Sequence, residues 1–360
     1  MKPTTLFDYM EIPLIQGGMG VGVSRCRLAG AVAREGGMGV ISAAQIGYDR
    51  EEFRHDPERA NLLELPRQIK LAKEIAKGRG LIAVNLMAVT QLYGEYVRTA
   101  CEAGADAIIT GAGLPTSLPA DAMGYSVRLA PIVSTAKAAQ VILKYWDRKY
   151  GRTADFLVVE GPLAGGHLGF SFETLAHLKE YDYDTEVKAV MAVKAKYEDK
   201  YGQAIPMFLA GGIRNSGDVA HALSLGADGV QVATRFVATE ECDAALAFKQ
   251  AYVNAKAEDI AIIHSPVGMP GRAVRNAFIR RMEAGGEAIT GCYNCLKACD
   301  PRTAPYCITQ ALVNAVKGDV ENGLIFCGGR VGEIDRITTV REVIDQLRPG
   351  WEVLPVPATA

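Results

Sequence analysis

The chain has 360 residues, 49% of them hydrophobic and 38 of them glycine, enough to bury the core of one large barrel or of two domains. Its formal net charge of −2 gives no electrostatic basis for binding nucleic acid or an anionic membrane. No basic segment followed by an apolar one opens the chain, and no apolar run reaches the ~18 residues of a membrane span. We therefore expect a cytoplasmic protein, whose eight cysteines are free thiols, metal ligands or redox groups rather than structural disulfides.

Eight apolar segments of strand length recur along the chain, each followed by a helical pattern. Their continuous apolar character is typical of strands buried on both faces of a parallel sheet. The expected strands are Ile12–Ile15, Met38–Ser42, Leu81–Met87, Ala107–Thr110, Ala130–Ser134, Phe156–Val159, Met207–Ala210 and Gly229–Val232. Eight such units predict an α/β fold, a (β/α)8 TIM barrel. An open doubly wound sheet is the alternative, but Gly17–Gly22 does not keep the Gly-x-Gly-x-x-Gly spacing of that fold.

Helix signals separate these strands. Ser24 is a candidate N-cap for a helix that runs to Glu35, and further helices are expected over Leu62–Lys77 and Tyr93–Ala103. Two short segments repeat a pattern in which a glycine ends a helix and an Asp precedes the next strand: Ala103–Ile108 and Leu225–Val230. The stretch Phe170–Gln203, rich in Lys, Glu, Asp and Tyr, is expected to form helices over the exit of the sixth strand.

The alternation of strands and helices ends after about Phe236. Four helical patterns follow, at Glu241–Val253, Arg272–Ala284, Ile308–Val316 and Thr339–Leu347. We interpret residues 1–240 as the barrel and residues 241–360 as an appended C-terminal helical region, or lid, that packs on it.

Glycine-rich segments follow the seventh and eighth strands, where α/β barrels commonly bind phosphate. Gly211-Gly212 leaves its amides unobstructed, Ser216 is a candidate N-cap for the next helix, and Ala233-Thr234 adds a hydroxyl one unit later. A phosphate site beside glycine-rich strand ends predicts FMN, whose flat ring needs uncluttered walls and hydrogen-bond donors.

The sixth strand leads to the most informative turn of the chain. Glu160 ends the strand, and Gly165-Gly166-His167 follows, so that backbone and imidazole can approach a flat ligand closely. Other residues expected to contact the cofactor follow the remaining strands: Gln16, Gly17, Gly18, Met19, Asn85, Lys137 and Ala210.

Four segments together resemble one family: Pro13–Met19, Asn85–Met87, Ala164–Gly169 and Ala210–Ile213. They resemble the nitronate monooxygenases, formerly called 2-nitropropane dioxygenases, and the flavin-dependent enoyl-acyl-carrier-protein reductases share that scaffold. The resemblance covers roughly residues 5 to 240. It implies that His167 is the active-site histidine, and that FMN is lined by Gln16, Gly18, Met19, Asn85, Lys137, Gly166, Gly211, Gly212 and Thr234. It also implies that a nitronate gives an electron to the flavin and that oxygen completes its cleavage to a carbonyl compound and nitrite.

One position departs from that pattern. The familiar monooxygenase turn has a Glu close before Ala-Gly-Gly-His, and Leu163 occupies that place here. The reductases also carry a His in this turn, so NAD(P)H-dependent reduction of an enoyl thioester or a quinone stays open. A non-redox enzyme with a phosphate-bearing ligand, such as an isomerase or aldolase, is a second alternative, with Lys137 as the nearest candidate for a Schiff base. All three functions imply a small-molecule substrate; the oligomeric state is open, and a homodimer is one candidate.

Four cysteines lie within one short C-terminal segment: Cys292, Cys295, Cys299 and Cys307. Four thiolates could hold zinc or an iron–sulfur cluster, although the C-x2-C-x3-C start does not match the ferredoxin patterns. The alternative is a set of reduced thiols in a helical lid. We therefore assign no metal to the active site.

Of the other histidines, His264 is a second catalytic candidate, because the following segment 266–270 could fold over the barrel mouth. His55, His177 and His221 lie in polar helical contexts and are expected at the surface.

Overall fold

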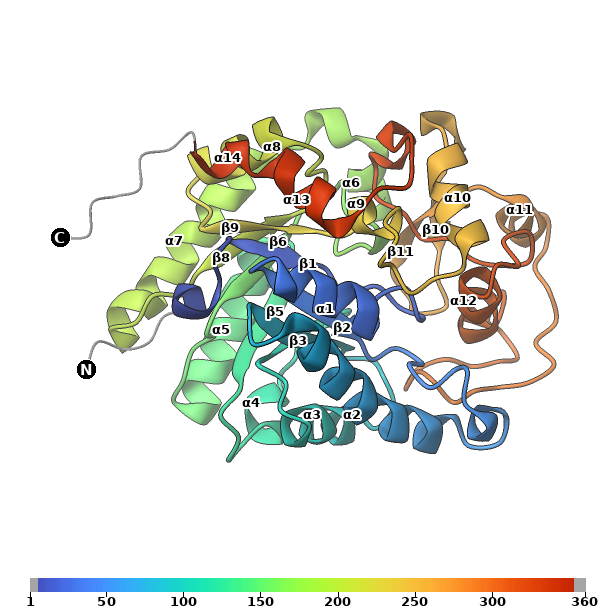
Figure 1. Cartoon of the computed structure of the whole chain (residues 1–360), viewed down its shortest axis with the longest axis horizontal. Helices are drawn as coiled ribbons and strands as arrows, with labels where there is room; N and C mark the ends of the chain where they lie inside the picture. Colours follow the sequence, from blue (N-terminus) through green and yellow to red (C-terminus); the bar gives the residue numbers. More distant parts are fainter. Residues whose placement is uncertain (1–5, 353–360) are drawn as a thin grey trace.

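The computed structural model describes residues 6–352. Within this range, eight parallel strands close into a barrel in the order β1-β2-β3-β4-β5-β6-β8-β9, and β9 pairs back onto β1. The strands are β1 (Leu14–Gln16), β2 (Met38–Ser42), β3 (Leu81–Met87), β4 (Ala107–Gly111), β5 (Arg128–Val133), β6 (Leu157–Glu160), β8 (Met207–Ala210) and β9 (Gly229–Val232). Each apolar segment predicted as a strand forms one, and the predicted (β/α)8 barrel is confirmed (Figure 1).

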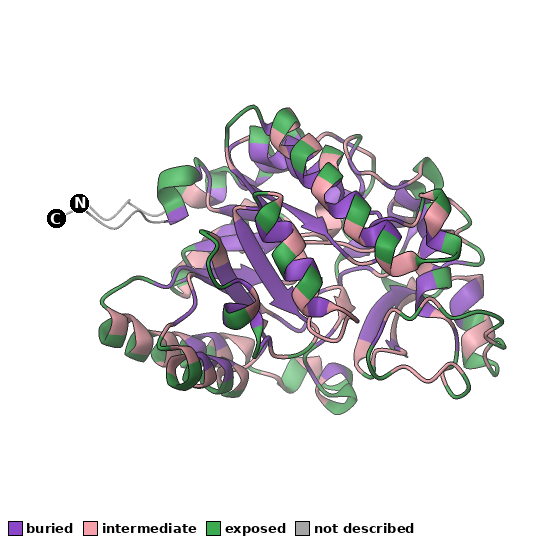
Figure 2. Cartoon of the chain, turned by 90° about the horizontal axis from the view of Figure 1, so that it is seen from below, coloured by how far each residue is buried: buried purple, intermediate pink, exposed green. Residues whose placement is uncertain are grey.

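Side chains alternate between the inside and the outside of the barrel, because successive residues of a strand point to opposite faces of the sheet. Those that point inward form one buried cluster, with Ile15, Met38, Val40, Leu81, Ala83, Ala107, Ile109, Ala130, Phe156, Val158, Phe208 and Ala210. Outward-facing side chains pack against the helices in a second, larger cluster. Figure 2 shows the buried strands beside helices that keep one exposed face. The barrel interior is therefore a packed core.

Helices connect the strands on the outside of the barrel. They are α1 (Cys26–Arg34), α2 (Pro57–Ala76), α3 (Tyr93–Glu102), α4 (Leu118–Asp121), α5 (Ala136–Tyr150), α6 (Phe172–Ala176), α7 (Tyr183–Tyr201), α8 (Ser216–Ser224) and α9 (Thr234–Val237). Short 3-10 turns add η1 (Leu6–Tyr9), η2 (Glu51–Arg54) and η3 (Leu178–Glu180). The helices predicted after the sixth strand are confirmed as α6 and α7.

The start of α1 differs from its prediction. Its N-cap residue is Arg25, not Ser24. The free amides at the helix start are instead bound by the distant Asp243, whose carboxylate accepts from the backbone N–H of Arg25 at 2.8 Å and of Leu28 at 3.1 Å. Ser24 turns the other way, and its hydroxyl accepts from the backbone N–H of Met19 at 2.8 Å. A contact across more than two hundred residues has replaced the local cap.

Two other helix starts are shifted for local reasons. Asn215, not Ser216, is the N-cap of α8, because its extended backbone aims the side-chain oxygen at two amides of the first turn. Helix α2 begins at Pro57, ahead of the predicted Leu62, because Asp56 caps it and proline suits a first helical turn.

The repeated helix-to-strand joint is present in both places. Gly104 and Gly226 adopt φ values of +81° and +93°, which glycine tolerates best. The carboxylates of Asp106 and Asp228 then each accept a backbone N–H from the start of the preceding strand, both at 2.8 Å. Each joint thereby fixes where one strand begins beside its neighbour.

The C-terminal region adds a small antiparallel sheet as well as helices. Strands β7 (Gly166–His167), β10 (Ile260–His264) and β11 (Pro270–Val274) pair in the order β10-β11-β7. The helical elements are α10 (Leu246–Asn254), η4 (Ala257–Asp259), α11 (Ala277–Glu283), α12 (Ile308–Val316), η5 (Val331–Glu333), α13 (Val340–Leu347) and α14 (Pro349–Glu352). In Figure 1, α10, α11 and α12 gather on one side of the molecule, whereas α13 and α14 return along the barrel.

Two of the predicted C-terminal helices are shorter than expected. The helix predicted from Arg272 is wrong in its first part, because Arg272 belongs to β11 and pairs with Gly166; α11 begins only after Asn276, which caps it. Helix α10 begins at Leu246 rather than at Glu241, since the preceding residues supply the cap of α1. The predicted helices at Ile308–Val316 and Thr339–Leu347 are confirmed as α12 and α13.

The C-terminal elements share the outer hydrophobic cluster of the barrel. Phe248, Tyr252, Val340 and Ile344 are buried in that cluster together with the side chains that cover the strands. None of the helices between Leu6 and Glu352 combines the length and the apolar character needed to span a bilayer.

Candidate active site

A cavity of about 460 Å³ lies at the C-terminal end of the barrel. The floor of the cavity is formed by the last inward-facing residue of each strand, or by the residue just after the strand. These residues are Gly17, Ser42, Asn85, Gly111, Ile132, Glu160, Ala210 and Gln231. At this level polar side chains, those of Ser42, Asn85, Glu160 and Gln231, join Ile132 and Ala210, which still pack with the core cluster. This is the end of the barrel where such folds carry their chemistry.

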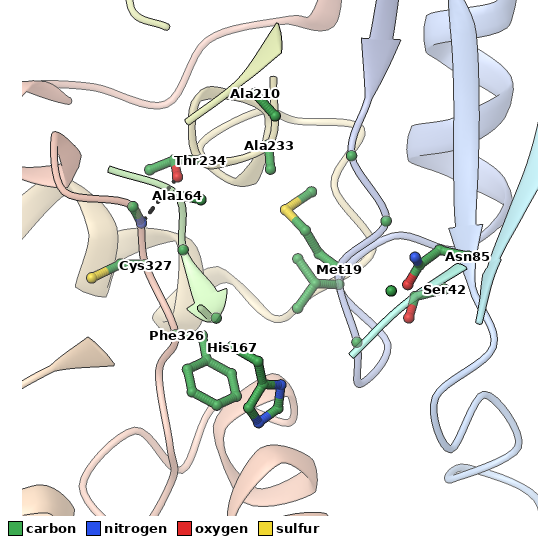
Figure 3. Close-up of a pocket in the computed structure, with 18 of the residues that line it drawn as sticks. Met19, Ser42, Asn85, Ala164, His167, Ala210, Ala233, Thr234, Phe326 and Cys327 are labelled. Atoms are coloured by element: carbon green, nitrogen blue, oxygen red, sulfur yellow. Dashed lines mark hydrogen bonds between the residues drawn. The ribbon is translucent and has the colours of Figure 1, made fainter. Parts of the chain in front are cut away.

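The segment after β1 forms a close-packed wall of the cavity. A Cβ added at Gly18 would lie 2.4 Å from the Cβ of Asn85, so no larger residue fits without movement. The Asn85 amide donates to the backbone oxygen of Ile109 at 3.2 Å, which fixes its orientation. Figure 3 shows Met19, Ser42 and Asn85 together on this side of the cavity.

Backbone amides gather at a second wall, beyond β8 and β9. Gly211 and Gly212 have φ values of +94° and +85°, and within residues 6–352 no acceptor takes their backbone N–H groups. Thr234 lines the same cavity, and its hydroxyl accepts from the backbone N–H of Gly328 at 3.1 Å (Figure 3). Unpaired amides that line a cavity are suited to an anionic group such as phosphate.

His167 stands on the sheet that joins the barrel to the C-terminal region. It pairs with Gly271 in β11, and its Nε2 lies 2.8 Å from the hydroxyl of Ser265, which is buried just after β10. Its ring meets the ring of Phe326 edge to face, with centroids 5.0 Å apart (Figure 3). Burial lowers the pKa of His167 to about 4, so the imidazole is neutral at physiological pH.

Glu160 faces the same cavity from the end of β6. Burial raises its pKa to about 8, against the opposing effect of the nearby Arg272 guanidinium. Arg272 is itself buried, and it donates to the backbone oxygen of Ala164. Ala164 begins the turn Ala164–His167, called the histidine turn below. At neutral pH the cavity therefore holds a protonated carboxyl group and a neutral imidazole.

All the predicted cofactor and catalytic residues line this one cavity except Gln16, Lys137 and the second catalytic candidate, His264. Gln16 lies in the outward register of β1, and its fully buried side chain bonds to the backbone of Val40 in the neighbouring strand. Lys137 is exposed on the first turn of α5, outside the cavity. The structure therefore brings neither side chain to the cavity.

The remaining histidines lie outside the cavity. His264 is exposed and stacks on Phe172, with ring centroids 4.1 Å apart. The segment that follows does reach the mouth, through Val267. His55, His177 and His221 are exposed, as expected.

Part of the cavity wall comes from a segment that sequence reasoning did not assign to the site. Residues 324–330 run across the histidine turn, where the backbone N–H of Gly329 donates to the oxygen of Leu163 at 3.0 Å. A Cβ added at Gly165 would lie 2.6 Å from the backbone of Cys327. Glycines in both segments therefore permit this close approach. The glycine pair that follows Cys327 was the available sequence signal.

The cysteines are free thiols. Between residues 6 and 352, no three His, Cys, Asp or Glu side chains are arranged so that they could hold a metal ion. Cys295 lines the cavity, and Cys327 is buried beside it, where burial raises its pKa to about 12.

One family model matches nearly the whole chain. Residues 3–350 match the family described as nitronate monooxygenase. A probable nitronate monooxygenase of Staphylococcus saprophyticus is 24% identical, over 87% of this chain and 85% of the relative. A bicyclic carboxyl-CoA dehydrogenase of Mycobacterium tuberculosis, (3aS,4S,5R,7aS)-5-hydroxy-7a-methyl-1-oxo-octahydro-1H-indene-4-carboxyl-CoA dehydrogenase, is 26% identical, over 79% of this chain and 69% of the relative.

Two solved structures have the same architecture. FabK from Thermotoga maritima superposes with a TM-score of 0.73 at 25% identity, covering 96% of this chain and 94% of FabK. A nitroalkane oxidase from Streptomyces ansochromogenes gives a TM-score of 0.71 at 20% identity, covering 97% and 99%, and shares the fold. The chain belongs to the nitronate monooxygenase family and is a flavin-dependent oxidoreductase.

Proposed function

We propose that this protein binds FMN and oxidises alkyl nitronates with oxygen to a carbonyl compound and nitrite. One observation carries the proposal: a single cavity has a glycine-lined wall, a set of unpaired amides and a half-buried, neutral histidine. The relative from Staphylococcus saprophyticus is similar over most of the chain and is named a probable nitronate monooxygenase, which supports the same reaction.

The residues present fit FMN. The amides of Gly211 and Gly212 and the hydroxyl of Thr234 would hold its phosphate, and one such site is what a mononucleotide needs. The wall at Gly18 leaves space that a Cβ would fill, which suits the edge of a flat ring, and Asn85 offers a polar side chain there. Bound FMN would supply the electron-accepting chemistry.

The protonation state of His167 favours a nitronate over a neutral nitroalkane as substrate. A histidine whose pKa lies near 4 is a poor base for removing a proton from carbon at neutral pH. It is suited instead to hydrogen-bonding the oxygens of an anion that is already formed. Ser265 occupies Nε2, which leaves Nδ1 as the ring nitrogen available to the substrate.

A reductase is the second candidate function. FabK is similar over nearly the whole chain, and the dehydrogenase relative from Mycobacterium tuberculosis is named for a carboxyl-CoA compound. Leu163, in place of the expected Glu, removes a charge beside the histidine turn and would be compatible with an uncharged acyl group there. In this alternative NAD(P)H reduces the flavin and an enoyl thioester or a quinone accepts the electrons.

Aerobic turnover of nitronates tests the proposal. We expect nitrite release together with oxygen consumption, and His167→Ala should keep the flavin while kcat/KM falls about 10²-fold or more. His264→Ala is the matched control, because that histidine is exposed and outside the cavity. Absence of nitrite, together with NADPH-dependent reduction of an enoyl thioester, would replace the proposed reaction by the alternative.

A further inference from the structure

Four of the eight cysteines lie in the connection between α11 and α12 (Figure 1): Cys292, Cys295, Cys299 and Cys307. Residues 284–307 contain no helix or strand, which is uncommon for so long a connection in a compact fold and is typical of a functional segment. Cys295 and Cys299 pack against one hydrophobic cluster, which also holds Ile308, the neighbour of Cys307. The hydrophobic cluster thereby gathers three of the four cysteines in one place.

The thiol groups also act on one another. Burial raises the pKa of Cys299, and the charges of Cys292 and Cys307 raise it further. Burial raises the pKa of Cys295 to about 11, although a hydrogen bond from Thr309 lowers it. Cys307 and Cys299 add to that increase. Because two charges interact more strongly as their separation falls, these mutual effects place the four sulfur atoms in one group.

Hydrogen-bond donors face two of the sulfur atoms. The backbone N–H of Asn294 donates to Sγ of Cys292 at 3.3 Å. Cys307 is the N-cap residue of α12. Burial raises the pKa of its thiol, and the backbone N–H groups of Gln310 and Thr309, in the first turn of the helix, lower it. Such donors favour the thiolate, which is the form of cysteine that binds a metal.

The turn between the first two cysteines is held from both sides. The ring of Tyr293 stacks on Phe53, with centroids 5.3 Å apart, and its hydroxyl donates to the side-chain oxygen of Gln310 at 2.6 Å. The side-chain amide of Asn294 donates to the carboxylate of Glu58, on α2, at 2.9 Å. The turn is therefore positioned by the barrel and by α12 together.

The arrangement of the thiols distinguishes between the metals that four thiolates bind, which are zinc and the iron of iron–sulfur clusters. A single zinc ion draws its four sulfur ligands to one point, at about 2.3 Å each. Between residues 6 and 352, no three side chains of the metal-binding types converge in this way. An iron–sulfur cluster offers several irons, each of which takes one thiolate, so that its sulfur ligands stand further apart.

We propose that a cluster of four irons and four sulfides binds to this group of cysteines, with one thiolate on each iron. Each thiol gives up its proton when it binds. Cys295 and the neighbouring Leu296 line the cavity, so the cluster would fix this part of the cavity wall from behind. The proposal goes beyond the reaction of the flavin and does not depend on it.

Iron and sulfide incorporation tests this inference. The protein is purified without oxygen and treated with ferrous iron and sulfide, and we expect about four of each per chain. Reduction by dithionite should then give an electron paramagnetic resonance signal. Cys292→Ala should lose the iron and the signal but keep its flavin, because Cys292 is exposed and outside the cavity.

Cys299→Ala is a second variant that should lose the iron, and retained flavin shows that each variant is folded. Cys26→Ala is the matched control, because Cys26 is a half-buried thiol on α1, away from this segment, and it should bind iron as the wild type does. One zinc per chain in place of iron, or less than one iron per chain after treatment, would overturn the inference. Equal iron contents in the wild type and both cluster variants would do the same.

Discussion

Replacing Glu160 by Gln should change how the stability of the protein depends on pH. Glu160 lies at the end of β6, and burial raises its pKa from 4.5 to about 8. Gln has nearly the same shape and does not titrate. The variant therefore removes one proton equilibrium and leaves the wall of the cavity in place.

The sign follows from where the proton is held. Between pH 4.5 and 8 the folded protein keeps the Glu160 proton and the unfolded chain releases it, so the free energy of unfolding falls as pH rises. His167 acts in the opposite direction, because its pKa is lowered to about 4, and its contribution to stability increases up to about pH 6.5. Above pH 6.5 the effect of Glu160 on stability no longer overlaps with that of His167. Between pH 6.5 and 8, Glu160 should lower the free energy of unfolding by about 1.5 kcal/mol.

The assay is denaturant unfolding of the wild type and Glu160→Gln at several pH values, with both proteins at the same flavin content. The variant should gain about 1.5 kcal/mol relative to the wild type between pH 6.5 and 8. Glu173→Gln is the control, because Glu173 is exposed on α6. A difference between the wild type and Glu160→Gln that does not change over this range would show that the Glu160 carboxyl group is not held in its protonated form.

Substitutions of two glycines test the packing of the barrel and the proposed phosphate site. A Cβ at Gly39 would lie 1.8 Å from the backbone oxygen of Ala29, so Gly39→Ala should lower the free energy of unfolding by about 3 kcal/mol, whereas Gly291→Ala, with open space around it, should change it little. Unfolding in denaturant measures both, and equal stabilities would contradict the packing of α1 on β2. Gly211→Ala should weaken flavin binding, because its φ is +94° and its Cβ would lie 2.8 Å from an amide nitrogen of the histidine turn. Flavin retained after gel filtration measures this. Gly124→Ala is the control, because Gly124 has a similar φ of +88° and open space around it; loss of flavin from both variants alike would argue against specific phosphate binding at Gly211.

The sequence predicts the barrel well because its signal is local. Each strand is a short, continuously apolar segment, and such a segment favours a strand that is buried on both faces of a parallel sheet. The floor of the cavity follows from the same pattern, since the inward register of each strand ends at a residue such as Asn85 or Glu160. That register also explains why Gln16, one residue out of phase with Gly17, turns away from the cavity.

Other features depend on contacts between distant segments, which a local pattern does not contain. The cap of α1 is Asp243, and the partner of His167 is Ser265. Arg272 carries a helical pattern but forms a strand, because pairing with the histidine turn outweighs its local preference. The cavity likewise combines residues of β3 with residues of the C-terminal region.

In the proposed reaction, this site takes electrons from a nitronate. The most direct test is anaerobic mixing of the flavin-loaded protein with an alkyl nitronate or, separately, with NADPH, while the visible absorbance of the flavin is recorded. We predict that the nitronate bleaches this absorbance within the time of one turnover and that NADPH leaves it unchanged. Bleaching by NADPH, with the nitronate inert, would contradict the proposed reaction.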